Sequence, residues 1–123
     1  MSPVVEHRAT GARPPRVLIL IATNAVGGPG KNLLNFLRLA GDNRRFFLCG
    51  FARRSAGEGE FIRTARHLGL SPTVLEERFP FDPGTIVHAL RLAKQRGAGI
   101  VQSHEYKSHM VAYVVSRLLG IPW

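Results

Sequence analysis

Disulfides, membrane spans and metal-binding motifs are all missing from this sequence. Cys49 is the only cysteine, so an internal disulfide is excluded and a reducing compartment is the natural setting. No window approaches the roughly 18 apolar residues of a transmembrane helix. The apolar run Val17–Ala22 is also shorter than the roughly 7–15 residues of a signal-peptide core. No HExxH motif, cysteine pair or carboxylate cluster indicates a metal. We therefore expect a cytoplasmic protein that holds no metal.

Acidic residues are scarce as well, with 8 Asp and Glu against 17 Lys and Arg, which gives a net charge of +9. The excess reflects either an arginine-rich composition or an anionic partner, such as phosphate groups, acidic lipid or nucleic acid. The basic residues are scattered, with short pairs at Arg44–Arg45 and Arg53–Arg54, so we expect no nucleic-acid partner. One hypothesis is that the protein makes peripheral contact with the inner face of an anionic membrane. Binding to anionic vesicles that weakens as salt is added would test it.

The apolar sequence that is present suffices for one α/β domain. At 123 residues, with 45% hydrophobic and 20% charged residues, the chain has the length and composition of a globular domain with its own core. Residues Met1 to Pro15 show no periodicity and are predicted to form a disordered tail. This leaves residues 16–123 as the folded domain.

The stretch Arg16–Gly41 is typical of the first half of a βαβ unit. Its run Val17–Ala22, rich in β-branched residues, predicts a strand that is buried on both faces. A glycine-rich turn follows, and apolar residues at helical spacing then predict a helix that ends near Gly41. Backbone N–H groups and the positive end of that helix would lie at the carboxyl end of the strand. The turn Asn24–Gly30 is therefore one wall of the predicted functional site.

Strands and helices are predicted to alternate along the rest of the chain. The expected elements are a strand at Arg45–Phe51, a helix within Gly57–Gly69, a strand at Thr73–Glu76, a helix from Asp82 to Gly97, a strand at Gly99–Ser103 and a last helix capped by Ser108. The order βαβαβαβα with right-handed crossovers predicts an α/β fold, a Rossmann-like doubly wound parallel sheet with strand order 3-2-1-4.

Ligands of doubly wound sheets bind off the carboxyl ends of the strands, where the strand order reverses. That reversal would fall between the first and fourth strands. The Asn24–Gly30 turn and the segment His104–Ser108 would then border one crevice, although they are far apart in the sequence. The predicted substrate-binding residues are Asn24, Gly27, Gly28, His104 and Lys107.

Most of these residues also have a purely structural interpretation. His104 would hydrogen-bond a hydroxyl or phosphate group of a ligand, or else cap the end of its strand. Lys107 would bind phosphate, or else lie solvated at the start of a helix. Gly27 and Gly28 would let the backbone approach a ligand, or else only make the turn. For Cys49, inside an apolar strand, a buried inert thiol is favoured over a nucleophile.

Nucleotide-binding motifs fit this chain incompletely. A phosphate-binding P-loop fails because Ala25 and Asn32 stand where it needs Gly and Ser or Thr. The dinucleotide fingerprint lacks its third glycine at Leu33, and it has Arg53 and Arg54 where it needs an acid. Because these arginines suit a 2′-phosphate, a stand-alone Rossmann-type nucleotide- or NADP-binding module is one alternative. A non-catalytic interaction domain is another.

Several motifs resemble the N-terminal domain of family 4 glycosyltransferases of the GT-B fold. They are a GG pair before a leucine-rich helix, the letters IVQSHEYKSH at Ile100–His109, and GIP after an apolar helix. The resemblance extends over Arg16–Trp123, with departures from the usual residues at Gln102 and Glu105. It implies the N-terminal half-domain of a GT-B architecture, incomplete at its C-terminus.

The resemblance also implies a function. The chain would be the acceptor-side portion of a glycosyltransferase of glycan biosynthesis, which transfers a sugar from a nucleotide-sugar donor to a glycan or lipid-linked acceptor. No cofactor is implied, because the nucleotide-sugar is a substrate. The catalytic residues of the family are expected beyond Trp123, so no catalytic residue is assigned. We expect a truncated chain that is inactive alone.

Overall fold

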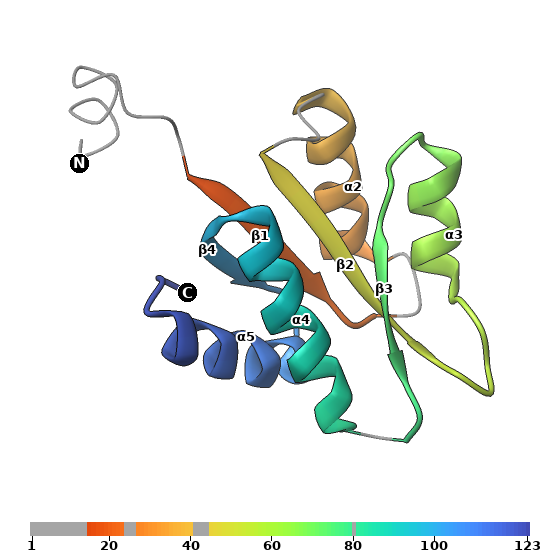
Figure 1. Ribbon diagram of the computed structural model, residues 1–123. Coiled ribbons are helices and arrows are strands. Elements are labelled where there is room, and N and C mark those ends of the chain that lie inside the picture. Colours follow the sequence, from red (N-terminus) through yellow and green to blue (C-terminus); the bar gives the residue numbers. More distant parts are fainter. Residues whose placement is uncertain (1–14, 24–26, 41–44, 80) are drawn as a thin grey trace, which may run out of the picture.

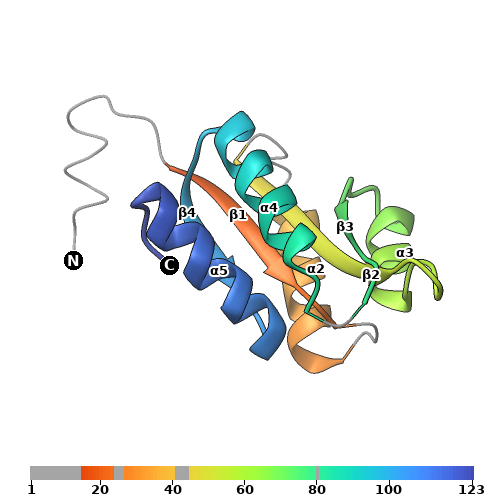
Figure 2. The same ribbon diagram turned by 60° about the horizontal axis from the view of Figure 1, so that its bottom comes forward.

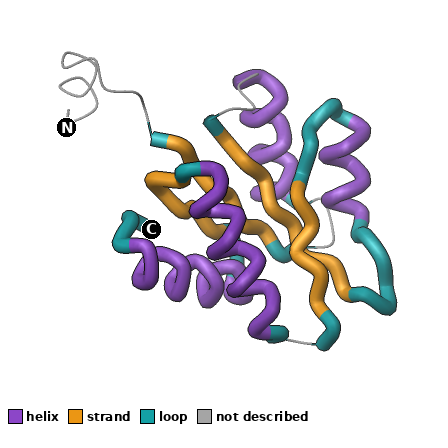
Figure 3. The backbone as a smooth tube through the Cα atoms, in the orientation of Figure 1, coloured by secondary structure: helices purple, strands orange, loops and turns teal. Residues whose placement is uncertain are grey.

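Within the described residues, which are 15–23, 27–40, 45–79 and 81–123, the computed structural model has a four-stranded sheet between two pairs of helices (Figure 1). The strands are β1 (Arg16–Ile21), β2 (Phe46–Arg53), β3 (Thr73–Glu77) and β4 (Ala98–Ser103). The helices are α2 (Gly28–Ala40), α3 (Glu60–His67), α4 (Pro83–Arg96) and α5 (Tyr106–Leu119). Figure 3 shows how strictly strands and helices alternate along the backbone.

The sheet is parallel throughout, and its strands lie in the order β3-β2-β1-β4. The predicted fold class and strand order are therefore confirmed. β1 lies inside the sheet, where Leu18 is opposite Phe47 of β2 on one side and Val101 of β4 on the other. The prediction of a tail over residues 1–15 falls, except for Pro15, outside the described residues.

Side chains of each strand alternate between two apolar cores, because successive residues of a strand point to opposite faces. One core contains Leu18 of β1 together with buried residues of α4 and α5. The other contains Ile19 of β1 with buried residues of α2 and α3. Figure 2 shows α4 and α5 on one face of the sheet, with α2 and α3 on the other. Burial on both faces explains why β1 is an uninterrupted apolar run.

The ends of α4 agree with the sequence signals. The Asp82 side chain accepts a hydrogen bond from the Gly84 N–H, and Pro83 is the first helical residue. At the other end Gly97 adopts a left-handed conformation with φ of 66°, as a helix-ending glycine does.

The start of α5 differs from the prediction, because the helix begins at Tyr106 with Glu105 as its N-cap. Ser108 is the third helical residue, so its interpretation as the cap is wrong. The two residues nevertheless form a reciprocal capping box, in which the Ser108 hydroxyl accepts from the Glu105 N–H at 3.0 Å. The usual pattern has the hydroxyl first and the carboxylate third. Here the carboxylate of Glu105 comes first and the hydroxyl of Ser108 third, which explains why the sequence pattern pointed to Ser108 as the cap.

One face of α5 is open to solvent in the described part of the chain. Val111 and Val115 are buried against the sheet and α4, whereas Tyr106, Met110 and Tyr113 are exposed. The sheet and α4 therefore cover one side of this helix, and its other side is open to solvent within these residues. The described ranges also contain no helix of the length and apolarity needed to cross a membrane.

The residues after α5 return to the sheet. The Val101 N–H donates a hydrogen bond to the carbonyl of Pro122 at 3.0 Å. The indole N–H of Trp123 donates to the Ser103 hydroxyl at 2.6 Å. This segment therefore lies along the outer edge of β4.

Cys49 lies in the middle of β2 with no exposed surface, and burial raises the pKa of its thiol to about 12. Because the thiolate is the nucleophile, we expect iodoacetamide at about pH 8 to modify Cys49 at least about 100-fold more slowly in the folded chain than in the urea-unfolded chain. The modified fraction is followed over time by mass spectrometry. Equal rates in the two states would contradict the buried position of this thiol.

Candidate functional site

The carboxyl edge of the sheet brings together two segments that are distant in the sequence. β1 and β4 are adjacent, and each leads at this edge toward a helix, α2 or α5. The His104 N–H donates to the Leu20 carbonyl at 3.2 Å, and the Ala22 N–H donates to Oε1 of Glu105 at 2.5 Å. The predicted adjacency of the first and fourth strands is confirmed, while the shared crevice and the binding roles of its residues remain predictions.

Gly27 and Gly28 lie exposed where α2 begins, and the Gly27 carbonyl accepts the Lys31 N–H at 2.8 Å. Within the described part of the chain, neither glycine is found with a positive φ, and a Cβ atom at either position would meet no described atom within 4 Å. The described fold therefore places no demand for glycine at these two positions. Both interpretations of these glycines, the approach of a ligand and the formation of the turn, remain predictions. Asn24, the other predicted residue of this turn, lies outside the described residues.

The backbone of His104 makes hydrogen bonds at the end of β4, and its side chain lies near the surface. Its N–H is shared between the Leu20 carbonyl and the Ser108 hydroxyl, and Nε2 lies 2.8 Å from the Gln102 amide nitrogen. Partial burial lowers the pKa of His104 below its ordinary value of 6.5, while the Glu105 carboxylate opposes that shift. The imidazole is therefore neutral at pH 7, in a form that can hydrogen-bond a hydroxyl group.

Lys107 lies on the first turn of α5 and has a partner that the sequence did not predict. Its ammonium donates to Oε1 of Glu77 at 2.8 Å and lies 5.6 Å from the centre of the Phe51 ring. The predicted third strand ended at Glu76, but β3 continues to Glu77 and brings this carboxylate to the carboxyl edge. Lys107 is thus held at the edge by an ion pair, with two further N–H groups on the same ammonium.

Glu77 and Arg53 are two further candidate site residues. Glu77 was not predicted from the sequence, and Arg53 was considered there only as a residue suited to a 2′-phosphate. They are register partners at the carboxyl ends of β3 and β2. Oε2 of Glu77 and Nε of Arg53 are buried atoms without a hydrogen-bond partner in the described structure. Arg54, the other arginine considered for a 2′-phosphate, pairs with Glu76 at 3.1 Å. The described ranges contain no group of three or more His, Cys, Asp or Glu side chains that could hold a metal ion.

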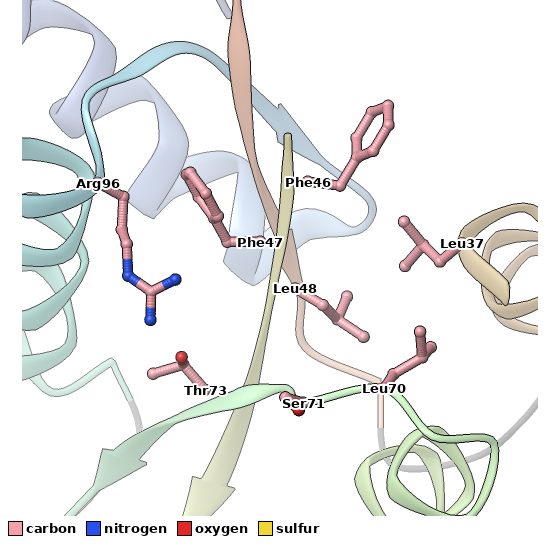
Figure 4. Close-up of a pocket in the computed structure, with 8 residues that line it drawn as sticks. All are labelled: Leu37, Phe46, Phe47, Leu48, Leu70, Ser71, Thr73 and Arg96. Carbon is pink, nitrogen blue, oxygen red and sulfur yellow. The ribbon is translucent and has the colours of Figure 1, made fainter. Parts of the chain in front are cut away.

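A hollow of about 170 Å³ lies at the opposite, amino edge of the sheet (Figure 4). It surrounds the first residues of β2, because β3 pairs with β2 only from Cys49 onward. The residues that line it are Leu37, Phe46, Phe47, Leu48, Leu70, Ser71, Thr73 and Arg96. Doubly wound sheets bind their ligands at the carboxyl edge, so this hollow is not part of the candidate site.

The parallel sheet, its strand order and the helices on both faces define a Rossmann-like half-domain of the GT-B type. No protein-family model and no curated protein sequence matches the chain. Solved structures do match it. One is HepE of Anabaena in complex with UDP, with a TM-score of 0.69 and 15% identity over 87% of this chain. Another is HepE with UDP and glucose, with a TM-score of 0.69 and 16% identity over 89%.

The chain spans only 28% of the length of each of these HepE structures. At such low sequence identity the likeness shows the fold alone, which is GT-B-like.

Proposed function

We propose that this chain is the acceptor-side portion of a glycosyltransferase, of the family 4 type that its motifs resemble. The enzyme transfers a sugar from a nucleotide-sugar donor to a glycan or lipid-linked acceptor. The observation that carries this proposal is the adjacency of β1 and β4, which brings the open start of α2 and His104 to one edge of the sheet. The complexes of HepE with UDP and with UDP and glucose support a nucleotide-sugar as the donor.

In this proposal the residues at the carboxyl edge hold substrate. Gly27 and Gly28 allow close approach of a ligand to the backbone, and Asn24, which precedes them in the sequence, is proposed to bind the same ligand. The neutral imidazole of His104 hydrogen-bonds a substrate hydroxyl, and Lys107 provides a positive charge at the start of α5. Because the chain spans 28% of its structural neighbours, the activity is proposed for the natural protein at full length.

A transfer assay with a panel of nucleotide-sugars tests this function. We expect the full-length natural protein to move labelled sugar from at least one donor, UDP-glucose among those tested, to a glycan or lipid-linked acceptor. The chain of 123 residues is expected to show no transfer by itself.

Two outcomes would overturn the proposal. One is the absence of transfer from every donor together with tight binding of NADP to the chain, which would indicate a dinucleotide-binding module instead. The other is sugar transfer by the full-length protein that continues unchanged after the whole segment that corresponds to this chain is deleted.

A further inference from the structure

A buried carboxylate oxygen at the carboxyl end of β3 is free to accept a hydrogen bond. The Glu77 side chain is only 3% exposed, and its Oε1 atom accepts from Lys107 at 2.8 Å. Its Oε2 atom has no partner among the described residues. Buried carboxylate oxygens are almost always hydrogen-bonded in proteins, so this atom is a strong candidate to receive a donor from a ligand.

Arg53 places a second unpaired polar atom beside Glu77. The two residues are opposite each other in β2 and β3. Each lies two positions after a residue of the core under α4 and α5, Phe51 or Leu75, so both side chains are on that face of the sheet. Nε of Arg53 is buried without a partner. One face of the sheet therefore carries an unpaired acceptor and an unpaired donor at neighbouring strand ends.

Glu77 and Lys107 open onto a small cavity of about 50 Å³ between the starts of α4 and α5. A single water molecule needs roughly 10–15 Å³, so the cavity has room for a larger group. Phe81 and Met110 also line it, and these residues are 55% and 46% exposed, whereas Arg53 is not among the lining residues. The cavity thus has a charged, hydrogen-bonding base and an apolar rim that is accessible to solvent.

Two polar groups that line the cavity, Glu77 and Lys107, select one chemical class of ligand, because Asp82, which also lines it, already accepts bonds from Arg78 and Gly84. A phosphate or carboxylate would suit Lys107, but it would oppose the unpaired carboxylate oxygen of Glu77. An amine would suit Glu77 and oppose Lys107. A hydroxyl group both donates and accepts, so neighbouring hydroxyl groups satisfy both residues. The carbon face of a sugar ring would then lie against the apolar rim.

We propose that Glu77 and Lys107 form a subsite for a neutral polyhydroxyl group, with Phe81 and Met110 against its apolar face. Glu77 accepts a hydrogen bond from a ligand hydroxyl, while Lys107 donates to a ligand oxygen. This inference rests on the proposed function, in which the polyhydroxyl group belongs to the acceptor. In this inference Lys107 binds a hydroxyl group of the acceptor and not a phosphate.

Methionine-methyl NMR provides a direct test, because the chain has only two methionines and Met110 is at the cavity rim. The chain is labelled with [methyl-¹³C]methionine and titrated with methyl α-glucopyranoside or, separately, with inorganic phosphate. We expect a saturable shift of the Met110 signal with the glucoside and none with phosphate. The Met1 signal serves as the internal reference. Glu77→Gln should weaken glucoside binding by about tenfold or more.

Glu76→Gln is the matched control, because Glu76 is the preceding residue of β3, is exposed and pairs with Arg54. It should leave glucoside binding unchanged. If Glu77→Gln does not fold, Lys107→Met replaces it, since Lys107 is more exposed than Glu77. An unmoved Met110 signal, an equal response to phosphate, or an equal loss in Glu76→Gln would overturn the proposal. The NMR titration does not measure sugar transfer, so its result is independent of the result of the transfer assay.

Discussion

An alanine in place of Asp82 is expected to lower the melting temperature of the chain by on the order of 10 °C. The Asp82 side chain is buried and accepts the Gly84 N–H at 2.8 Å and the Arg78 N–H at 3.0 Å. It also accepts two bonds from the Arg78 guanidinium, both at 3.0 Å. Alanine removes the cap of α4 and the anchor of the connection from β3 in one step. Circular dichroism during heating measures the effect.

The same carboxylate should give stability a defined pH dependence. Hydrogen bonds from the Arg78 guanidinium, and from the backbone N–H groups of Arg78 and Gly84, hold the pKa of Asp82 well below its usual range. Because the folded pKa lies below the unfolded value of about 3.9, Asp82 stabilises the fold above about pH 4. That stabilisation is lost as the pH falls through the folded pKa.

Asp82→Asn keeps a capping side chain and removes the charge, so it isolates this effect. We expect the difference in unfolding free energy between the unmodified chain and Asp82→Asn to be constant from about pH 5 to 8 and to shrink below about pH 4. As a control, Glu76→Gln breaks the exposed pair with Arg54 and should change the melting temperature very little. A difference that grows toward acid pH would contradict this account.

Tryptophan at position 28 is expected to cut sugar transfer by the full-length protein at least about tenfold while it leaves the melting temperature nearly unchanged. A Cβ atom at Gly28 would meet no described atom within 4 Å, so the new side chain displaces no part of the described fold. The same bulk would keep a substrate away from the backbone. His104→Ala should reduce transfer by a similar factor, because a lost hydrogen bond to a bound group costs about 1–3 kcal/mol.

Transfer rates and melting temperatures are measured on the same preparations of these variants. Gln95→Trp is the control for bulk, since Gln95 is exposed near the end of α4 that lies away from the carboxyl edge. His88→Ala, on the exposed side of α4, is the control for loss of an imidazole. Unchanged transfer in both Gly28→Trp and His104→Ala would exclude this edge of the sheet as the substrate site.

The strands and their order could be predicted because each depends on a short-range signal and one general rule. The apolar residues of β1 indicate burial on both faces, and Asp82 and Gly97 mark the ends of a helix. Right-handed crossovers then leave few arrangements of four parallel strands. The adjacency of β1 and β4, and with it the position of His104 beside the end of β1, follows from these steps.

The contacts that shape the candidate site could not be predicted in this way. The pairing of Glu77 with Lys107, and that of Glu105 with the Ala22 N–H, joins residues that are remote in sequence. Each depends on where a side chain points at the end of an element, and periodicity carries no information on this. Gly50 is similar, since a Cβ there would lie 2.8 Å from Cγ1 of Ile62 and α3 could not pack as it does.

Because the last residues of the chain pack along β4, the fluorescence of Trp123 reports on the end of that strand. Trp123 is the only tryptophan, and its indole bonds to Ser103, the residue before His104. Its ring centre lies 6.0 Å from that of His109 and 6.1 Å from that of Tyr113. Fluorescence emission therefore comes from the strand end next to the candidate site, and it would move to longer wavelength if this segment detached. Compared with circular dichroism, it separates local opening at β4 from unfolding of the whole chain.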